Sequence, residues 1–351
     1  MGFYELAERA LALEREGRKI VRLNVGDTNL PTPLCAVEAA ATRMRQGKSG
    51  YGPSAGLQEL REAVAGREGC KAANVVVGPG SKHLIYGLMS ILCRGGDSVA
   101  FPSPHWPMYE LACSQLGLKM NALQSGEADG WMFDASGLRG AKLSIICNPL
   151  NPTSTIYREK EIEAAIEEAQ REGTHVILDE AYKGLAFREI PVFEGAIRVR
   201  SFSKEFNMEG WRLGYAVAPE DVAKRLTAYN QITATCVAPF VQEAGRAALA
   251  EEKKILEGNR RIWKKRAEAA AKALSDAGFR FAKPEAGIYL FASHENVKDC
   301  EKFSLALLEK EGVCVAPGTG FGNYRKHIRI CVNQEEQVLE AAIAKMGRAA
   351  V

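Results

Sequence analysis

One short segment of the chain holds a lysine, two serines and an arginine at close spacing. In residues 200–215, Ser201 and a second serine precede Lys204, and Arg212 follows eight residues later. A lysine that forms a Schiff base needs a fixed position and a neutral amine, while the rigid donor fork of an arginine matches phosphate oxygens. Together these requirements fit pyridoxal phosphate. The same window also fits a solvated loop lysine beside an unrelated arginine.

Polar side chains also follow two strand-like runs. Asp179 and Tyr182 come after the apolar run 176–178, and Asn151 comes after the run 143–147. Open α/β sheets bind ligands at the carboxyl ends of their strands. A buried Asp179 would keep a pyridine nitrogen protonated, and Tyr182 and Asn151 could donate to a ring oxygen. The alternatives are a helix-capping aspartate, a core tyrosine and an ordinary Asn-Pro turn.

A glycine-rich turn, Gly-Pro-Gly-Ser-Lys, occupies residues 78–82 between a strand-like run and a helical pattern. Backbone N–H groups at a helix start, together with the helix dipole, attract anions, so Gly80, Ser81 and Lys82 could hold a phosphate. An ordinary βα connection is the alternative. The turn is not a Walker loop, and His83 stands where a dinucleotide motif needs its third glycine, which argues against a nucleotide-binding α/β protein.

Two further residues have types that suit a cofactor site. Trp106 follows another strand end and could stack on a flat ring, although a buried tryptophan is the commoner explanation. Arg329 lies inside an apolar strand-like run, so its charge must find a partner, either a structural acid or a substrate carboxylate.

The elements that must position these residues alternate in a regular way. Short apolar runs separated by helical patterns predict an α/β fold with a mainly parallel sheet covered by helices on both faces. A long helical region, 221–276, is interrupted at Pro239. Strand-like runs and helices after it predict a smaller α+β domain. We expect residues 1–30 to pack with that small domain, residues 31–245 to form the large cofactor-binding domain, and residues 246–351 to form the small one.

Composition excludes several classes of function. The net charge of +3, from 46 basic and 43 acidic residues, gives no electrostatic case for nucleic acid. No apolar run reaches the roughly 18 residues that a membrane helix needs, and the start lacks a signal-peptide pattern. Nine cysteines without C-x-x-C spacing favour free, mostly buried thiols in a reducing compartment, which predicts a cytoplasmic protein. The five histidines show no metal-ligand spacing, so we expect no metal.

In this order, the segments resemble the class I and II aminotransferases, pyridoxal-phosphate enzymes of the aspartate aminotransferase fold (fold type I). The likeness runs from about Leu23 to near the C-terminus. Its most specific part is the Ser-x-Ser-Lys…Gly-x-Arg-x-Gly segment around Lys204.

The resemblance implies roles around the cofactor ring. Lys204 would form the Schiff base and move the proton, with Asp179 and Tyr182 as the other catalytic residues. Asp179 would hold the pyridine nitrogen, Trp106 would stack on the ring, and Asn151 and Tyr182 would hold the phenolic oxygen.

The resemblance also implies contacts to the phosphate, the substrate and a second subunit. The implied phosphate ligands come from the glycine-rich turn and the lysine segment: Gly80, Ser81, Lys82, Ser201 and Arg212. Tyr51 would reach the phosphate of the neighbouring subunit's cofactor, which implies a homodimer with shared active sites. Arg329 would clamp the substrate α-carboxylate, near Asn151 and the loop that contains Gly26.

The chain departs from the family pattern at a few points. Ser154 stands where the motif around Asn151 ends in glycine, so the turn must avoid a conformation that only glycine adopts. Trp106 replaces a frequent tyrosine, and the chain is short for the family. None of these changes removes a cofactor-contacting group, so they bear on substrate fit.

The implied activity is transfer of the amino group of an L-amino acid to a 2-oxo acid by a ping-pong cycle. Aspartate and aromatic amino acids are the leading donors, and 2-oxoglutarate is the expected acceptor. A pyridoxal-phosphate-dependent β-elimination (C–S) lyase shares these motifs. A non-catalytic pyridoxal-phosphate sensor domain is the third possibility, and the absence of a basic helix-turn-helix segment argues against it.

Overall fold

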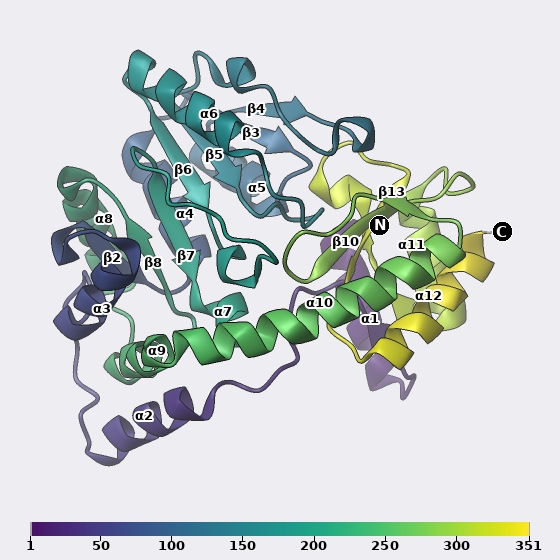
Figure 1. The fold of residues 1–351 in the computed structure, drawn as a ribbon, viewed down its shortest axis with the longest axis horizontal. Coiled ribbons are helices and arrows are strands. Elements are labelled where there is room, and N and C mark those ends of the chain that lie inside the picture. Colours follow the sequence, from purple (N-terminus) through teal and green to yellow (C-terminus); the bar gives the residue numbers. More distant parts are fainter. Residues whose placement is uncertain (1, 351) are drawn as a thin grey trace.

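The computed structural model describes residues 2–350, which fold around a seven-stranded sheet (Figure 1). From edge to edge the strands are β2 (Val75–Gly78), β8 (Gly214–Val217), β7 (Ile197–Ser201), β6 (His175–Asp179), β5 (Leu143–Cys147), β3 (Ser98–Ser103) and β4 (Lys119–Gln124). β8 is antiparallel to β2 and β7, and every other neighbouring pair is parallel. The mainly parallel sheet is therefore confirmed.

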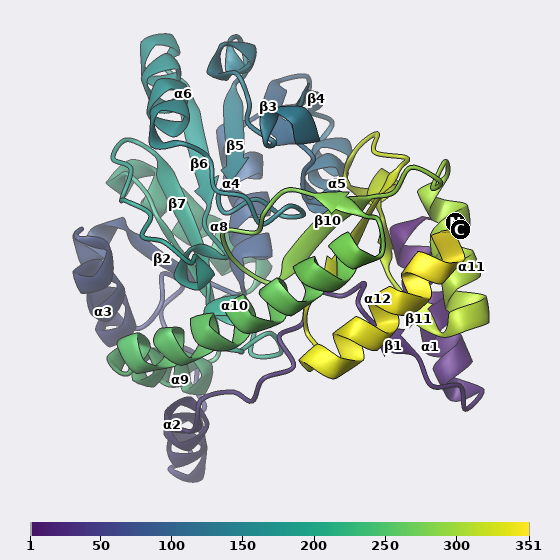
Figure 2. The same ribbon diagram turned by 45° about the vertical axis from the view of Figure 1, so that its right-hand side comes forward.

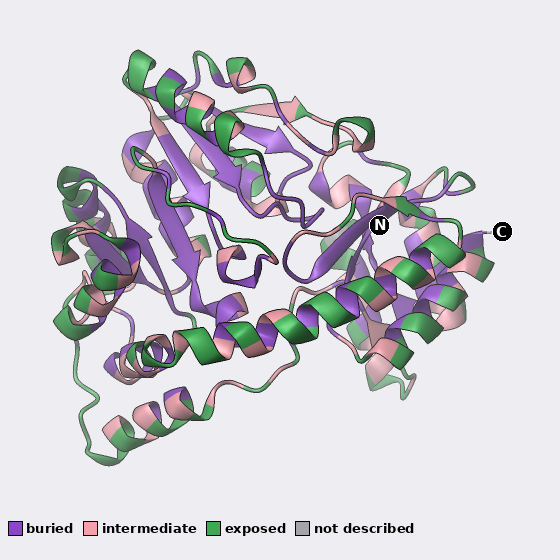
Figure 3. Ribbon diagram, viewed as in Figure 1, coloured by how far each residue is buried: buried purple, intermediate pink, exposed green. Residues whose placement is uncertain are grey.

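Helices pack on both faces of this sheet, and in Figure 1 α6 lies in front of it and α4 behind it. The helices of this part are α2 (Leu34–Arg45), α3 (Gln58–Glu68), α4 (Ser81–Leu92), α5 (Pro107–Leu116), α6 (Glu159–Glu172), α7 (Phe202–Glu205), α8 (Glu220–Thr233) and α9 (Pro239–Ala250). Every residue of β5 and β7 is buried (Figure 3). β5 is accordingly mostly apolar, and the buried charges of β7 are paired with acids.

A second, antiparallel sheet is formed by the C-terminal part of the chain. Its strands, in order, are β12 (Ala316–Pro317), β13 (His327–Cys331), β10 (Tyr289–Ser293) and β9 (Arg280–Phe281). Beside it, β1 (Val21–Arg22) pairs in parallel with β11 (Val313–Cys314). The helices of this part are α1 (Phe3–Arg15), α10 (Glu252–Asp276), α11 (Cys300–Glu311) and α12 (Glu336–Ala350).

The helix α10 connects the two sheets. It follows α9 and runs as one 25-residue helix toward the small sheet, where it packs against α12 (Figure 2). The break predicted at Pro239 is confirmed, because α9 begins there with proline at its first turn, where no intrahelical N–H is needed. The N-terminal residues join the C-terminal part of the chain through the pairing of β1 with β11, and the domain boundaries at residues 30 and 245 stay a prediction.

Two global properties bear on the sequence-based expectations. Six of the nine cysteines are buried. Within residues 2–350, no helix combines the length and the apolar character needed to cross a bilayer.

Candidate active site

A cavity of about 620 Å³ lies between the large sheet and the small sheet. Its lining includes Asn151 after β5, Asp179 at the end of β6 and Ser201 at the end of β7. The small sheet contributes Tyr289 from β10 and Arg329 from β13. The cavity thus lies at the carboxyl edge of the parallel strands, where such sheets bind ligands, and its volume is typical of a small-molecule site.

Eleven of the thirteen predicted site residues line this cavity. They are Gly26, Ser81, Lys82, Trp106, Asn151, Asp179, Tyr182, Ser201, Lys204, Arg212 and Arg329. The two others lie elsewhere: Gly80 supports the turn behind Arg212, and Tyr51 is 90% exposed on the surface. The individual roles of all thirteen remain proposals.

Lys204 is held by a short helix, α7, that starts where β7 ends. The Ser201 side chain caps this helix by accepting the N–H of Ser203 at 3.2 Å. Phe202 is buried and donates its N–H to the carbonyl of Leu213 at 3.1 Å. The backbone that carries Lys204 is therefore held at the cavity wall.

Asp179 is a buried acid on the cavity wall. It is 3% exposed and accepts a hydrogen bond from the Tyr109 hydroxyl at 2.6 Å and from the N–H of Ala181 at 3.3 Å. Burial raises the pKa of Asp179 to about 6, against the opposing effect of both hydrogen bonds. A cationic N–H in the cavity would restore its charge, so Asp179 suits a pyridine nitrogen.

Cations gather at the start of α4. Gly80 has φ +87°, and a Cβ there would lie 2.5 Å from Arg212 Nη2, so the turn and the guanidinium fit together only with glycine. Burial lowers the pKa of Lys82, and the neighbouring Arg212 lowers it further. Two cations beside the first N–H groups of a helix, which begins at Ser81, form a site suited to phosphate.

Arg329 lies at the other end of the cavity, where it donates to Asn151 Oδ1 at 3.0 Å and to the carbonyl of Asn24 at 2.6 Å. Its guanidinium lies over the rings of Tyr289 and Phe321, at 4.2 and 4.7 Å. These two hydrogen bonds go to neutral oxygens. A substrate carboxylate that entered this end of the cavity would meet the Arg329 guanidinium.

Tight packing explains the glycine in the nearby loop. A Cβ on Gly26 would lie 1.8 Å from the Tyr289 hydroxyl, so no larger residue fits. That hydroxyl lies 3.1 Å from the hydroxyl of Tyr182. Burial holds the pKa of Tyr182 well above its usual value, so Tyr182 stays a protonated donor.

Ser154 adopts φ +58°, in the left-handed region that favours glycine but that other residues also enter. The turn therefore avoids a conformation that only glycine adopts, as expected, but it uses one that glycine adopts more easily. The Ser154 hydroxyl accepts the N–H of Tyr289 at 3.2 Å, which ties this turn to the small sheet.

Three residues were not predicted from the sequence: Tyr289 and Glu209, which line the cavity, and Tyr109, which supports Asp179 from behind. Tyr109 comes from α5, which the sequence-based prediction lacked, and Tyr289 lies in a predicted strand without any signal of a site. Glu209, five residues after Lys204, places Oε1 3.5 Å from the lysine Nζ. An acidic residue so close to the lysine in the sequence could have predicted this contact.

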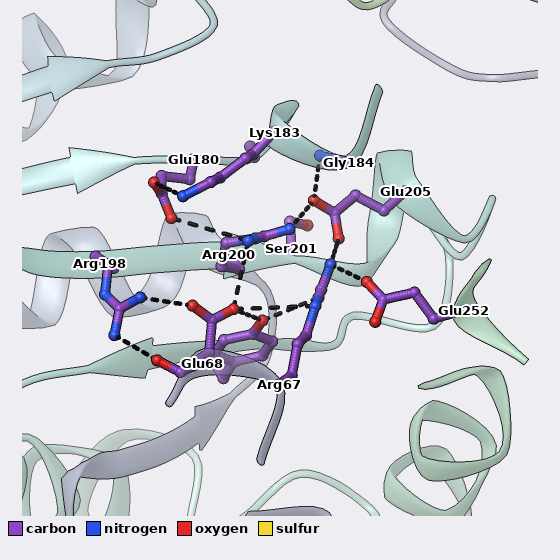
Figure 4. Close-up of polar contacts among 12 residues, drawn as sticks. Arg67, Glu68, Glu180, Lys183, Gly184, Arg198, Arg200, Ser201, Glu205 and Glu252 are labelled. Atoms are coloured by element: carbon purple, nitrogen blue, oxygen red, sulfur yellow. Dashed lines mark hydrogen bonds and ion pairs between the residues drawn. The ribbon is translucent and has the colours of Figure 1, made fainter. Parts of the chain in front are cut away.

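A buried ion cluster lies behind the cavity wall (Figure 4). It consists of Arg67, Glu68, Glu180, Lys183, Arg198, Arg200, Glu205 and Glu252. Glu205 accepts from Arg200 at 2.6 Å, from Gly184 N–H at 2.8 Å and from Arg67 at 2.9 Å. Burial opposes its charge, but Arg200 and Arg67 outweigh burial and lower the pKa of Glu205 to about 2. The cluster fixes the segments that carry Asp179 and Lys204 relative to each other.

The residues of the cavity fit pyridoxal phosphate. One lysine amine lies among three features: a buried acid whose charged form a cationic partner would favour, a helix start with two cations, and an indole face. Each matches one part of that cofactor: the ring nitrogen, the phosphate, the ring face and the aldehyde.

Comparison with known proteins gives a consistent result. The family model described as aminotransferase class I and II matches residues 18–346. An aspartate aminotransferase of Thermococcus kodakarensis is 34% identical over 322 residues, which cover 91% of this chain and 86% of that protein. An aspartate/prephenate aminotransferase of Thermus thermophilus is 27% identical, with coverage of 97% and 93%. The structure of Thermus thermophilus aspartate aminotransferase with maleate superposes with a TM-score of 0.94 at 26% identity, covering 99% of this chain and 96% of that one.

Proposed function

The chain belongs to the class I and II aminotransferases, and we propose that its cavity binds pyridoxal phosphate and moves the amino group of an L-amino acid to a 2-oxo acid. The observation that carries this proposal is the convergence of Lys204, Asp179 and Arg329 on one cavity. The three supply an amine nucleophile, an acid for a ring nitrogen and a cation for a carboxylate.

Each residue then has a physical task. Bound pyridoxal phosphate would supply an aldehyde that reacts with amines and a ring that withdraws electrons. Arg329 binds the α-carboxylate of the amino acid and orients its α-carbon toward Lys204, whose amine takes up the α-proton. Asp179 keeps a proton on the ring nitrogen, and Trp106 covers the ring face.

The polar ends of the cavity complete the binding. Lys82 and Arg212 bind the phosphate with the turn at Gly80 and Ser81, and Ser201 contributes its hydroxyl. Asn151 and Tyr182 hold the phenolic oxygen. The reaction proceeds in two half-reactions with a shared site, which produces ping-pong kinetics.

Aspartate and aromatic amino acids are the proposed donors, and 2-oxoglutarate is the proposed acceptor. The similar proteins are named for aspartate and prephenate, and one was solved with the dicarboxylate maleate. The cavity-lining cations among the described residues are Lys82, Lys204, Arg212 and Arg329, and each has a task above. A side-chain carboxylate would therefore be neutralised by a cation from a second subunit.

A homodimer with shared sites accounts for two surface features. Tyr51 is 90% exposed, and α2 exposes Leu34 at 68% and Met44 at 50%. We expect α2 to pack against a second copy and Tyr51 to reach that copy's cofactor phosphate. The cysteine pattern supports a cytoplasmic location.

A donor screen with the purified holoenzyme tests the proposal. With aspartate and 2-oxoglutarate we expect oxaloacetate and glutamate. The screen also includes tyrosine and phenylalanine as donors and prephenate as an acceptor. Lys204→Ala is expected to lower turnover by 10²-fold to 10⁴-fold or more, roughly the contribution of a positioned proton-transfer group. Release of ammonia from cysteine without any need for a 2-oxo acid would instead establish the lyase. Full activity of Lys204→Ala would overturn the site.

A further inference from the structure

A segment that we call the strap, residues 23–32, connects the two ends of the cavity. Near its start, the carbonyl of Asn24 accepts from Arg329 at 2.6 Å, at the end proposed for the substrate carboxylate. Near its middle, the N–H of Thr28 donates to Glu209 Oε1 at 2.8 Å, at the lysine end. The strap therefore contacts Arg329 directly and is connected to Lys204 through Glu209.

The turn after α7, which carries Glu209, is fixed from two sides. Thr32 of the strap donates its hydroxyl to the carbonyl of Asn207 at 2.8 Å. Arg212 donates to the carbonyl of Glu209 at 2.6 Å. With its backbone held in this way, the Glu209 carboxylate has little freedom to leave the cavity wall.

One oxygen of Glu209 serves two donors. Its Oε1 accepts the Thr28 N–H and also lies 3.5 Å from Lys204 Nζ. The side chains of Lys204 and Glu209 are 16% and 23% exposed, so water screens the pair only in part. At this short distance the Glu209 carboxylate attracts the Lys204 ammonium group.

We propose that Glu209 is a positioning residue that holds the Lys204 ammonium group whenever this amine is not covalently engaged, and that joins it to the strap over the substrate. When Lys204 is engaged, its ammonium group is no longer present and Glu209 keeps its bond to Thr28. When Lys204 is released, Glu209 receives it at a defined place beside the substrate. The inference rests on the proposed role of Lys204, but its main test requires no aminotransferase activity.

Two substitutions separate the charge of Glu209 from its hydrogen bond. Glu209→Gln keeps an oxygen for the Thr28 N–H and removes the charge, while Glu209→Ala removes both. The full-length chain, freed of cofactor and checked for native circular dichroism, is treated with limiting trinitrobenzenesulfonate at one mildly alkaline pH. Labelling of Lys204 is quantified by peptide mass spectrometry relative to the exposed Lys119.

We expect both variants to raise the labelling rate of Lys204 by about fivefold, because the amine loses the carboxylate that holds it away from the reagent. The matched variant Glu257→Gln, at an exposed glutamate of α10, is expected to label like the wild type. Unchanged labelling in both Glu209 variants would overturn the proposal. A higher labelling rate of Lys204 in Glu209→Ala alone would show that Glu209 only attaches the strap. That result would also overturn the proposal.

Steady-state kinetics of the holoenzyme provide a second readout. Glu209→Gln is expected to lower kcat about fivefold with little change in KM, since it leaves the strap attached. Glu209→Ala is expected to lower kcat and also raise KM, because it releases the strap as well. Equal KM values in the two variants would contradict the tether. If no donor were transaminated, the proposed function would fail while the labelling result still decided the role of Glu209.

Discussion

At the scale of single residues, the burial of Asp179 at the proposed site lowers the folding stability of the chain. In the cofactor-free chain its carboxyl is buried, and burial holds its folded pKa near 6, above the value of about 3.9 in an unfolded chain. Between these values the folded state binds more protons than the unfolded state. Folding stability therefore falls as the pH rises from about 4 to about 6, and the loss is complete above that range.

Asp179→Asn is expected to remove this cost. Relative to the wild type, the cofactor-free variant should be more stable by up to about 3 kcal/mol at pH 8 and should show no such gain near pH 4. Transaminase turnover should fall by about 10²-fold or more, since the ring nitrogen loses its counter-charge. Urea unfolding at both pH values measures the first effect, with the exposed Asp129→Asn as control. A stability gain that is independent of pH would contradict the assignment to ionisation.

Ser154 combines a left-handed backbone with a hydrogen bond that glycine cannot make. Ser154→Gly relieves the backbone and loses the acceptor of the Tyr289 N–H, so we expect a net change within about 1 kcal/mol. Ser154→Ala keeps the strained conformation and leaves that N–H unpaired, so it should destabilise by about 1–3 kcal/mol. Urea denaturation of the two variants checks this order, and an alanine variant as stable as the glycine variant would refute it.

At the scale of elements, buried strands with apolar runs were predictable, and elements with little burial were not. β5 and β6 match the apolar runs 143–147 and 176–178, and the helix α6 separates them along the chain. The prediction lacked α2, α5 and β4. β4 is an edge strand with an exposed start, so it shows no clear burial pattern, and α2 buries only Ala36 and Ala40.

Long-range packing explains two of the missed site residues. Tyr109 reaches Asp179 because α5 starts at Pro107 and packs against the sheet, a contact between positions 70 residues apart. Tyr289 meets Arg329 only through antiparallel pairing of β10 with β13. Residue types and chain order led to the proposed cofactor, but long-range packing decides which side chains surround the site.

The elements β6, β7 and α3 are joined by the buried ion cluster, and Glu205 is its most strongly held acid. Glu205→Gln would leave Arg200 and Arg67 buried with one partner charge fewer, so we expect a loss of about 3–5 kcal/mol at pH 7. The folded pKa near 2 lies below the value of about 4.3 in an unfolded chain. This stabilisation is therefore present above about pH 4.3 and disappears as the pH falls toward 2.

Denaturant unfolding at a series of pH values measures the difference between Glu205→Gln and the wild type. The difference should shrink steadily in acid, and the exposed Glu257→Gln should show no difference at any pH. A variant as stable as the wild type at pH 7 would show that the cluster does not hold α7 and β6 together.

At the scale of the whole molecule, the proposed role of Tyr51 requires a second chain. Arg329 and Lys204 line one cavity between the two sheets, whereas Tyr51 does not line it and is 90% exposed. A symmetric dimer would place each Tyr51 at the other subunit's site, because a two-fold interface uses the same surface on both copies. Each site would then combine Lys204 from one subunit with Tyr51 from its neighbour.

Mixing two inactive variants tests this arrangement. If Tyr51→Ala and Lys204→Ala subunits exchange at random, about half of the dimers are hybrids, and each hybrid has one doubly altered site and one intact site. At a cofactor concentration too low to load Tyr51→Ala, the mixture should therefore recover about a quarter of the wild-type activity, although neither parent is active alone under that condition. Because Tyr51→Ala removes a phosphate contact, its own defect should appear as weaker cofactor binding, measurable by cofactor fluorescence. The same mixture without subunit exchange, held at low temperature, is the control. Sites confined to single subunits would give no recovery, because every chain in the mixture would carry one damaging substitution in its own site.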